Sequence, residues 1–283
     1  MRYIATKGLD RGGTNAFLSL FHYHPEFFSL SEKVHSQTGK KNIKKIPINK
    51  LFNYSMFKGL DKNLKDPSII RNIIFKMPRE AEFIGNIFRY RYHEYKYDKI
   101  IYLIRNPLRV YISQQNANKK RGKTRTSKWD YWHSILNQTS ENIAIYKKSD
   151  KQNSRLLIYE YFIKNLDVEL PKLLKWIDKD SKRIKVNPKM GLKFWRHCGI
   201  CNSKLINFEY LICPKCKKKI LGHGRFNPIT PLRYKRTIQA NLHTYFADKP
   251  KKINDVRQKF GEVLFNYWFN DKNHNYATIL EIS

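Results

Sequence analysis

The sequence predicts an α/β fold of three layers, in which a mainly parallel sheet is covered by helices on both faces. Two patterns favour this fold. Short apolar segments alternate along the chain with longer segments of helical spacing, an order typical of parallel sheets. The segment 99–104, KIIYLI, is almost continuously apolar, as a strand buried on both faces is. The 283 residues suffice for one large α/β domain or two small ones.

Four segments are expected to form the strands of the sheet. Each is short and consists mainly of apolar, β-branched or aromatic residues. The predicted strands are residues 2–6, 72–76, 99–104 and 155–159. Because ligands of open α/β sheets bind outside the carboxyl ends of the strands, we expect functional residues in the loops that follow these segments.

Helices are expected between and after these strands. Pro107 suits the first turn of one helix, because proline lacks the N–H that a helix leaves unpaired there. The predicted helices are approximately residues 14–22, 79–92, 107–118, 129–148, 168–177 and 253–270. Two basic segments without periodicity are predicted to be loops: residues 33–50, as a loop or lid, and residues 119–128.

The chain is strongly basic. Lys and Arg total 56 and Asp and Glu total 23, which gives a net charge of +33. This charge attracts nucleic acids, sulfated or carboxylated glycans and nucleotides. A solvated lysine-rich surface with no polyanionic partner would give the same value. No apolar run approaches the roughly 20 residues that span a bilayer, and the first residues lack the apolar core of a secretory signal. We therefore expect a cytoplasmic protein without a membrane span.

The loop after the first predicted strand has the composition of an anion site. Gly12 and Gly13 would let backbone N–H groups approach an anion closely before a helix. Gly8 and Gly13 have the spacing of the phosphate loop G-x-x-x-x-G-K-[ST], which predicts a P-loop-like core, but Thr14 replaces its lysine. Arg105-Asn106 follow the third strand, where such enzymes often have a magnesium-binding aspartate. Metal-assisted hydrolysis of nucleoside triphosphates is therefore disfavoured. A glycine turn that only connects strand and helix is the alternative.

The glycine loop and four later segments resemble sulfotransferases that use 3′-phosphoadenosine 5′-phosphosulfate (PAPS). Residues 11–15, RGGTN, resemble the R-S-G-T-T loop of that family, and His24-Pro25 follow the first helix as in many members. Residues 76–79, KMPR, resemble the K-x-P segment after the next strand. Residues 99–107, KIIYLIRNP, resemble the strand ending in R-[DN]-P, and residues 156–160, LLIYE, resemble the strand ending in Y-E. The pattern is nearest to the tyrosylprotein, bacterial and Golgi carbohydrate enzymes.

The resemblance implies two cationic cradles, because PAPS is anionic at its 5′-phosphosulfate and at its 3′-phosphate. The loop would hold the 5′ end through backbone N–H groups, the Thr14 hydroxyl and the Arg11 guanidinium. Arg105 would pair with the 3′-phosphate, Ser113 would add a hydroxyl, and Tyr159 would lie near the adenine. An ordinary salt bridge is the alternative for Arg105, and a buried core position is the alternative for Tyr159. The implied cofactor-binding residues are Arg11, Gly12, Gly13, Thr14, Asn15, Arg105, Ser113 and Tyr159.

Sulfuryl transfer resembles phosphoryl transfer, since it needs positioning and charge stabilisation without a covalent intermediate. By resemblance, Lys76 and Arg11 would stabilise the charge that develops on the leaving phosphate. Glu32 lies eight residues after His24, where the tyrosylprotein branch has the base that takes the proton of the acceptor. The alternative for Glu32 is an ordinary surface acid, and the competing bases are His24, Glu26 and His35. This chemistry requires no metal.

All four cysteines lie in one stretch, as two C-x2-C pairs separated by eleven residues. This is the pattern of a structural zinc ribbon, in which four thiolates leave no open position on the metal. Two disulfides and an iron–sulfur cluster are the alternatives, and His197 is interpreted as a bystander. The predicted ligands are Cys198, Cys201, Cys213 and Cys216. The expected organisation is a sulfotransferase-like core over 1–195, an inserted ribbon over 196–221, and a C-terminal cofactor loop and helix over 222–283.

The sequence therefore predicts a PAPS-dependent sulfotransferase with a structural Zn²⁺ and with adenosine 3′,5′-bisphosphate (PAP) as product. Its acceptor would be a hydroxyl or an amine, and the basic segments 40–50 and 119–128 favour an anionic acceptor such as a glycan, by electrostatic steering. A small alcohol, a lipid headgroup and a tyrosine stay open as acceptors. Three basic residues are candidates for closing over the 3′-phosphate: Arg233, Lys235 and Arg236. A zinc-ribbon protein that binds nucleic acid is the alternative function, followed by a P-loop kinase or NTPase.

Overall fold

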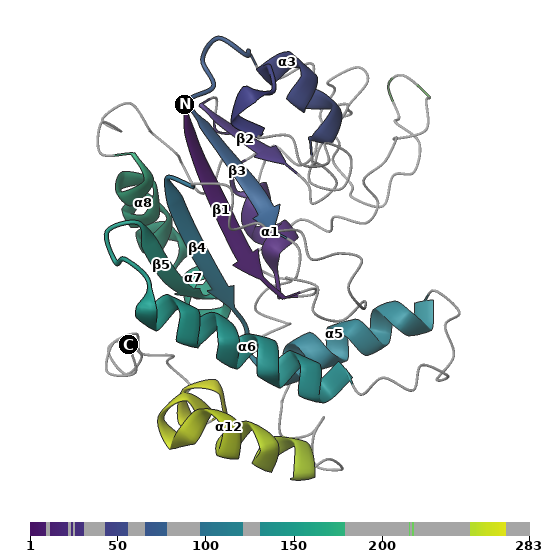
Figure 1. Cartoon of the computed structure of the whole chain (residues 1–283). Coiled ribbons are helices and arrows are strands. Elements are labelled where there is room, and N and C mark those ends of the chain that lie inside the picture. Colours follow the sequence, from purple (N-terminus) through teal and green to yellow (C-terminus); the bar gives the residue numbers. More distant parts are fainter. Residues whose placement is uncertain are drawn as a thin grey trace. The chain divides into compact units, whose positions relative to one another are not determined.

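The computed structural model describes residues 1–9, 12–21, 24, 26–30, 43–55, 66–77, 97–120, 131–178, 215, 217 and 250–269. They include a five-stranded parallel sheet with the order β2-β3-β1-β4-β5 (Figure 1). The strands are β1 (Arg2–Gly8), β2 (Phe27–Leu30), β3 (Asn72–Met77), β4 (Lys99–Ile104) and β5 (Ser154–Ile158). The prediction of an α/β fold with a mainly parallel sheet is confirmed.

Helices precede or follow most of the described strands along the chain. The α-helices are α1 (Thr14–Ser19), α3 (Ile48–Leu51), α5 (Pro107–Lys120), α6 (Tyr131–Lys148), α7 (Tyr159–Lys164), α8 (Leu166–Ile177) and α12 (Pro250–Phe269). Two short 3-10 helices, η1 (Ile43–Lys45) and η2 (Phe52–Tyr54), flank α3. No helix within these described residues is long and apolar enough to cross a membrane.

Backbone hydrogen bonds show that several strands begin at the same edge of the sheet. β2 and β3 run parallel, with Phe27 opposite Asn72 at the start of both strands. The Arg2 N–H, at the start of β1, donates to the carbonyl oxygen of the residue before β3 at 2.7 Å. The Asp98 N–H, just before β4, donates to the Tyr3 carbonyl oxygen at 2.9 Å. Because the strands are parallel, the loops that follow them leave from the opposite, carboxyl edge.

The chain forms two compact units, and both β1 and β4 contribute residues to each. The first unit comprises residues 1–6, 15–100 and 167–230, and the second comprises residues 7–14, 101–166 and 231–283. In the first unit, the rings of Phe28 and Phe52 stack with centroids 4.7 Å apart, and those of Tyr3 and Phe75 stack at 5.9 Å. The buried side chains of this core are Tyr3, Phe28, Leu30, Leu51, Phe52, Ile70, Ile73 and Phe75.

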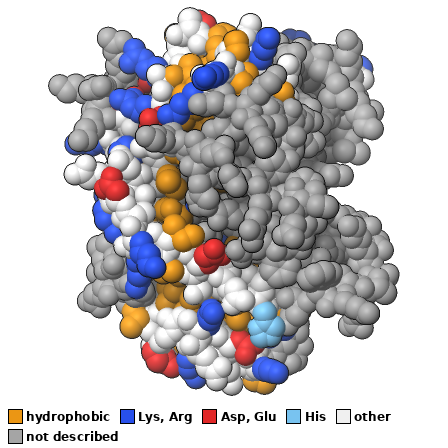
Figure 2. All heavy atoms as spheres, in the orientation of Figure 1, with side chains coloured by type: hydrophobic (Ala, Val, Ile, Leu, Met, Phe, Trp, Pro, Cys, Tyr) orange, Lys and Arg blue, Asp and Glu red, His pale blue; other side chains and the backbone are white. Residues whose placement is uncertain are grey.

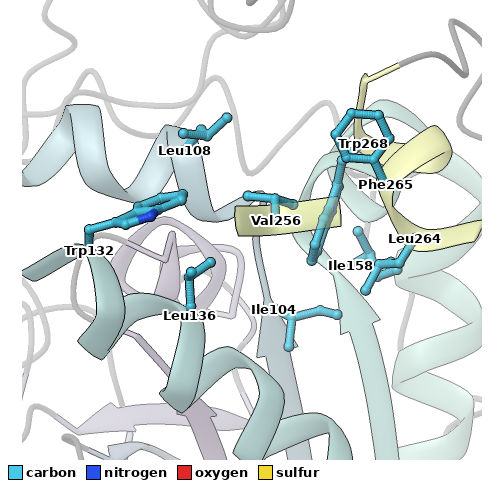
Figure 3. Packing of buried hydrophobic residues seen from close by; sticks show 9 residues of the cluster. All are labelled: Ile104, Leu108, Trp132, Leu136, Ile158, Val256, Leu264, Phe265 and Trp268. Carbon is cyan, nitrogen blue, oxygen red and sulfur yellow. The ribbon is translucent and has the colours of Figure 1, made fainter. Parts of the chain in front are cut away.

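The second unit has its own hydrophobic core, to which two strands and three helices contribute (Figure 3). Its buried members are Ile104, Leu108, Trp132, Leu136, Ile158, Val256, Leu264, Phe265 and Trp268. The Trp132 indole N–H also donates to the Asp255 carboxylate at 2.7 Å, which joins α6 to α12. Helix α12 therefore completes this core although it begins at residue 250, far along the chain from the end of α8 at residue 177.

The structure contains a strand that the sequence analysis did not predict. β2 has only four residues, FFSL, and all of them are buried. A segment this short shows no alternation when both of its faces are covered, so its pattern does not identify it as a strand. Phe27 packs against Phe21 at 5.1 Å between ring centroids, and the Ser29 hydroxyl donates to the Leu18 carbonyl oxygen at 3.1 Å. These contacts bind β2 to the segment that includes α1.

The prediction of a loop over residues 33–50 is wrong for the end of that segment. Residues 43–45 and 48–51 are helical, because Leu51 and Phe52 anchor the short helices in the first core while Lys44 and Lys50 stay exposed. Tyr159 was predicted to end a strand but instead begins α7. The other described helices differ from the predictions at their ends only. The predicted helix 79–92 and most of the predicted loop 119–128 lie outside the described residues.

Candidate functional site

The loop between β1 and α1 folds back onto the end of β1. The Gly12 N–H donates to the Leu9 carbonyl oxygen at 2.8 Å, which closes a tight turn. A Cβ atom on Gly8 would lie 2.6 Å from the Thr14 methyl carbon, so Thr14 packs directly against the strand end. Gly13 has φ of +91°, a conformation that side chains strongly disfavour. The glycines are therefore required by the close return of the chain.

The same loop contacts Tyr159, the residue that follows β5. A Cβ atom on Gly13 would lie 2.4 Å from Cε2 of the Tyr159 ring, which is too close for any side chain at this position. Tyr159 is 8% exposed. Burial raises the pKa of its phenol, Glu160 raises this pKa further, and Arg105 opposes both effects. The buried position considered for Tyr159 is observed, and its contact with an adenine stays a prediction.

The junction between β4 and α5 is built by Arg105, Asn106 and Pro107. The Leu108 N–H donates to the Asn106 side-chain oxygen at 3.0 Å, so Asn106 caps α5 and Pro107 occupies its first turn. The Asn106 side-chain amide also donates to the Trp268 carbonyl oxygen at 3.4 Å. Asn106 thus joins the start of α5 to the end of α12, because its side-chain amide both accepts and donates a hydrogen bond.

Arg105 contacts both residues that follow β5. Its guanidinium carbon lies 5.0 Å from the centre of the Tyr159 ring, and its Nε lies 3.7 Å from Oε1 of Glu160. The exposed fractions of the Arg105 and Glu160 side chains are 13% and 4%. The salt bridge considered for Arg105 at the strand end is therefore present. Binding of a phosphate by Arg105 stays a prediction.

Three strand–helix junctions of the second unit therefore meet around Tyr159. Gly13 represents the junction after β1, Arg105 the junction after β4, and Tyr159 the junction after β5. The sequence analysis predicted all three as cofactor-binding residues, and the structure brings them together. Ser113 lies half-buried on α5, two turns after Pro107.

Sequence analysis missed two residues that organise this junction, Asn106 and Glu160. Both stand inside the segments quoted for the family resemblance, beside Arg105 and Tyr159 respectively. Glu160 is buried, and both oxygens of its carboxylate accept the Asn106 N–H, at 3.2 and 3.4 Å. The signal that could have identified it is the acid of the Y-E segment, since an acid at a strand end needs a cationic partner when it is buried.

The first unit contains the predicted residues Lys76 and Asn15. Lys76 is the fifth residue of β3 and is 7% exposed, in a strand whose six residues are all buried. A lysine is seldom buried to this degree without a partner for its charge. Asn15 is half-buried in α1.

Two candidate bases of the first unit lie at the amino edge of the sheet. The Glu26 N–H donates to Nδ1 of His24 at 3.1 Å, and the His24 ring packs edge-on against Phe27. The Glu26 carbonyl oxygen accepts the N–H groups of Arg71 and Asn72, at 3.0 and 2.9 Å. These contacts hold His24 and Glu26 beside the start of β3, whereas Lys76 lies near its end.

Several predicted residues lie outside the described part of the chain: Arg11, Glu32, His35, Cys198, Cys201, Cys213, Cys216, Arg233, Lys235 and Arg236. Within the described residues, no group of three or more His, Cys, Asp and Glu side chains could hold a metal ion. The predicted zinc ribbon therefore stays a prediction.

Basic side chains are scattered over the described part of the face seen in Figure 2, among acidic and hydrophobic ones. Several described lysines lie over aromatic rings. Lys252 is 4.4 Å from the centre of the Tyr111 ring and 4.9 Å from that of Trp132, and Lys99 is 4.9 Å from that of Trp176. Part of the basic charge therefore supports packing within each unit.

No protein-family profile matches the chain, and no curated protein matches it. Among solved structures, the sulfotransferase domain of the Synechococcus PCC 7002 olefin synthase is similar, with 13% identity and a TM-score of 0.45 over 85% of this chain and 88% of that one. The sulfotransferase domain of the curacin biosynthetic pathway has 15% identity and a TM-score of 0.42, over 73% and 80%. Mouse sulfotransferase SULT7A1 complexed with PAP has 13% identity and a TM-score of 0.43, over 99% and 88%.

Proposed function

We propose that this chain is a sulfotransferase that transfers the sulfuryl group of PAPS to a hydroxyl or amine acceptor. The observation that carries the proposal is the meeting of Gly13, Arg105 and Tyr159 in the second unit. A nucleotide with two separate anionic ends needs a backbone cradle for one and a cationic side chain for the other. A glycine turn and an arginine that both lie next to one buried ring supply both.

The residues present fit such a nucleotide. Since the Gly12 N–H is used by the turn, the 5′ end would be bound by the backbone after it, by the Thr14 hydroxyl and by Arg11. The 3′-phosphate would pair with Arg105, with Ser113 as a second donor. The Arg105 side chain as a whole is 13% exposed, and its Nε is buried beside Glu160. When bound, PAPS would supply the activated sulfuryl group.

In the chemical step that we propose, Lys76 and Arg11 stabilise charge on the leaving phosphate, and Glu32 takes the proton of the acceptor. The register of β2 and β3 argues against Glu26 as this base. Glu26 is held at the opposite end of the strand pair β2–β3, about five residues or 17 Å along the strands from Lys76.

We further propose a structural zinc on Cys198, Cys201, Cys213 and Cys216, inserted between the core and the C-terminal helix. Four thiolates would fill the tetrahedral shell of the metal, so this zinc would take no part in sulfuryl transfer. Elemental analysis of protein purified without chelator should find one zinc per chain. A preparation that contains no zinc, or that shows the absorbance of an iron–sulfur cluster, would contradict this assignment.

Equilibrium binding to the full chain tests the function. We expect PAP to bind more tightly than ATP, because Thr14 replaces the lysine with which phosphate loops hold a triphosphate. We also expect PAP binding to depend less steeply on salt than binding to DNA would. Tight, salt-sensitive DNA binding without PAP binding would instead favour the nucleic-acid-binding alternative. Release of PAP from PAPS, alone and with anionic glycan acceptors, then tests the reaction itself.

A further inference from the structure

Glu160 is a buried acid whose hydrogen-bond and ion-pair partners come from the junction between β4 and α5. It is the second residue of α7, and its side chain is 4% exposed. Its carboxylate accepts the Asn106 N–H on both oxygens and lies 3.7 Å from Nε of Arg105. A buried carboxylate without such partners would be strongly destabilising. These contacts therefore fix Arg105 and Asn106 relative to the end of β5, although Asn106 precedes Glu160 by 54 residues.

The same contacts restrict the side chain of Arg105. Its guanidinium faces the Tyr159 ring at 5.0 Å, and the Glu160 carboxylate lies at its Nε. A free arginine side chain loses rotamer entropy when it is immobilised. Because the fold already restricts Arg105, a ligand that binds this side chain need not order it. The direction of α5 is fixed by the same acid, since Asn106 also caps that helix.

Building on the proposed function, we propose that Glu160 is a positioning residue of the nucleotide site, which holds Arg105 beside the start of α5 and thereby favours nucleotides with a 3′-phosphate. A second effect opposes this one, because the negative charge of Glu160 repels any phosphate nearby. We expect positioning to prevail, since Arg105 and the Asn106 N–H already compensate this charge.

Glu160→Gln separates the two effects. Glutamine keeps an oxygen that can accept the Asn106 N–H but removes the charge that attracts Arg105. We expect calorimetric titration of the full chain to show that the affinity for PAP falls about tenfold. The affinity for adenosine 5′-phosphate should change less than about twofold. The matched control is Glu262→Gln, which breaks an exposed ion pair to Arg257 at 2.8 Å in the same unit. Both dissociation constants should stay unchanged in this control.

A double-mutant cycle distinguishes positioning from a general effect on folding. In an Arg105→Ala background, Glu160→Gln should cause no further loss of PAP affinity, because the residue through which it acts is absent. If Glu160→Gln fails to fold, Glu160→Asp serves instead, because it keeps the charge and shortens its reach. This variant should lower the affinity for PAP more than the affinity for adenosine 5′-phosphate.

Three results would overturn the inference: equal losses for both nucleotides, an additive loss in the Arg105→Ala background, or tighter PAP binding in Glu160→Gln. Each of them requires a wild-type chain that prefers PAP to adenosine 5′-phosphate. A wild-type chain without this preference would instead contradict the proposed function, so the two failures are distinguishable.

Discussion

Each compact unit contains a cation near the end of a strand, Arg105 just after β4 and Lys76 within β3. In the second unit, Arg105 and Glu160 lie against each other and against Tyr159 and Asn106, within one network of short contacts. In the first unit, Lys76 lies on a strand whose residues are all buried. The difference suggests a division of roles. We expect residues of the second unit to determine how tightly and selectively a nucleotide binds, and Lys76 to act on the charge that develops during the reaction.

The largest effect is expected for Glu32→Gln. Glutamine keeps the shape of the side chain and removes its basicity, so turnover should fall by about 10²–10⁴-fold while the affinity for PAP stays the same. Steady-state assays with an identified acceptor, together with PAP titrations, measure the two quantities. Turnover near that of the wild type would contradict this role for Glu32 and indicate His24, Glu26 or His35 as the base.

Lys76→Ala should act on turnover as well, by about 10²–10³-fold, because Lys76 is proposed to meet charge that is complete only in the transition state. The KM for PAPS should rise much less than kcat falls. Slow hydrolysis of PAPS to PAP measures this effect without an acceptor. Lys50→Ala, which removes an exposed lysine of the first unit, is the matched control and should leave both constants unchanged. A higher KM with an unchanged kcat would instead indicate that Lys76 acts in ground-state binding of PAPS.

Local patterns predicted the second-unit junctions well, because their determinants are close in sequence. Pro107 predicted the start of α5, and the glycines before Thr14 predicted the tight turn. What sequence could not supply was pairing over long separations. Glu160 meets Asn106 across 54 residues, and Asn106 meets Trp268 across 162.

Short buried elements were the other source of error. β2 has four residues and no alternation, so neither length nor period distinguished it from a loop. The helical turns before Leu51 likewise carry a polar, basic sequence whose structure depends on two anchoring side chains in the first core. Tertiary packing, which a local pattern does not contain, decided the structure of both segments.

Arg105→Ala tests the proposed role of the second unit directly. Loss of a charge-assisted contact, worth roughly 1.5–3 kcal/mol, should lower the affinity for PAP by about 10- to 100-fold. The affinity for adenosine 5′-phosphate should fall less than about threefold. Titration calorimetry of both nucleotides measures the ratio. Arg257→Ala, which removes a half-exposed arginine of the same unit, should leave the ratio unchanged. An equal loss of affinity for both nucleotides would show that Arg105 does not bind the 3′-phosphate.

The smallest effect is expected for Tyr159→Phe, which removes the phenol hydroxyl and keeps the ring next to Gly13 and Arg105. Burial raises the pKa of Tyr159 above its ordinary value of 10.0, so the folded chain holds this proton at a pH where the unfolded chain has lost it. The free energy of unfolding should therefore be unaffected by Tyr159 below about pH 10 and should decrease as the pH rises further. In Tyr159→Phe this decrease should be shallower, while the similarly raised pKa of Tyr3 contributes to both proteins. Urea titrations of the two proteins between pH 8 and about pH 11 measure the difference, because urea unfolding gives the free energy at each pH. Identical slopes would mean that the Tyr159 phenol ionises as readily in the folded chain as in the unfolded one, which its packing against Gly13 and Arg105 opposes.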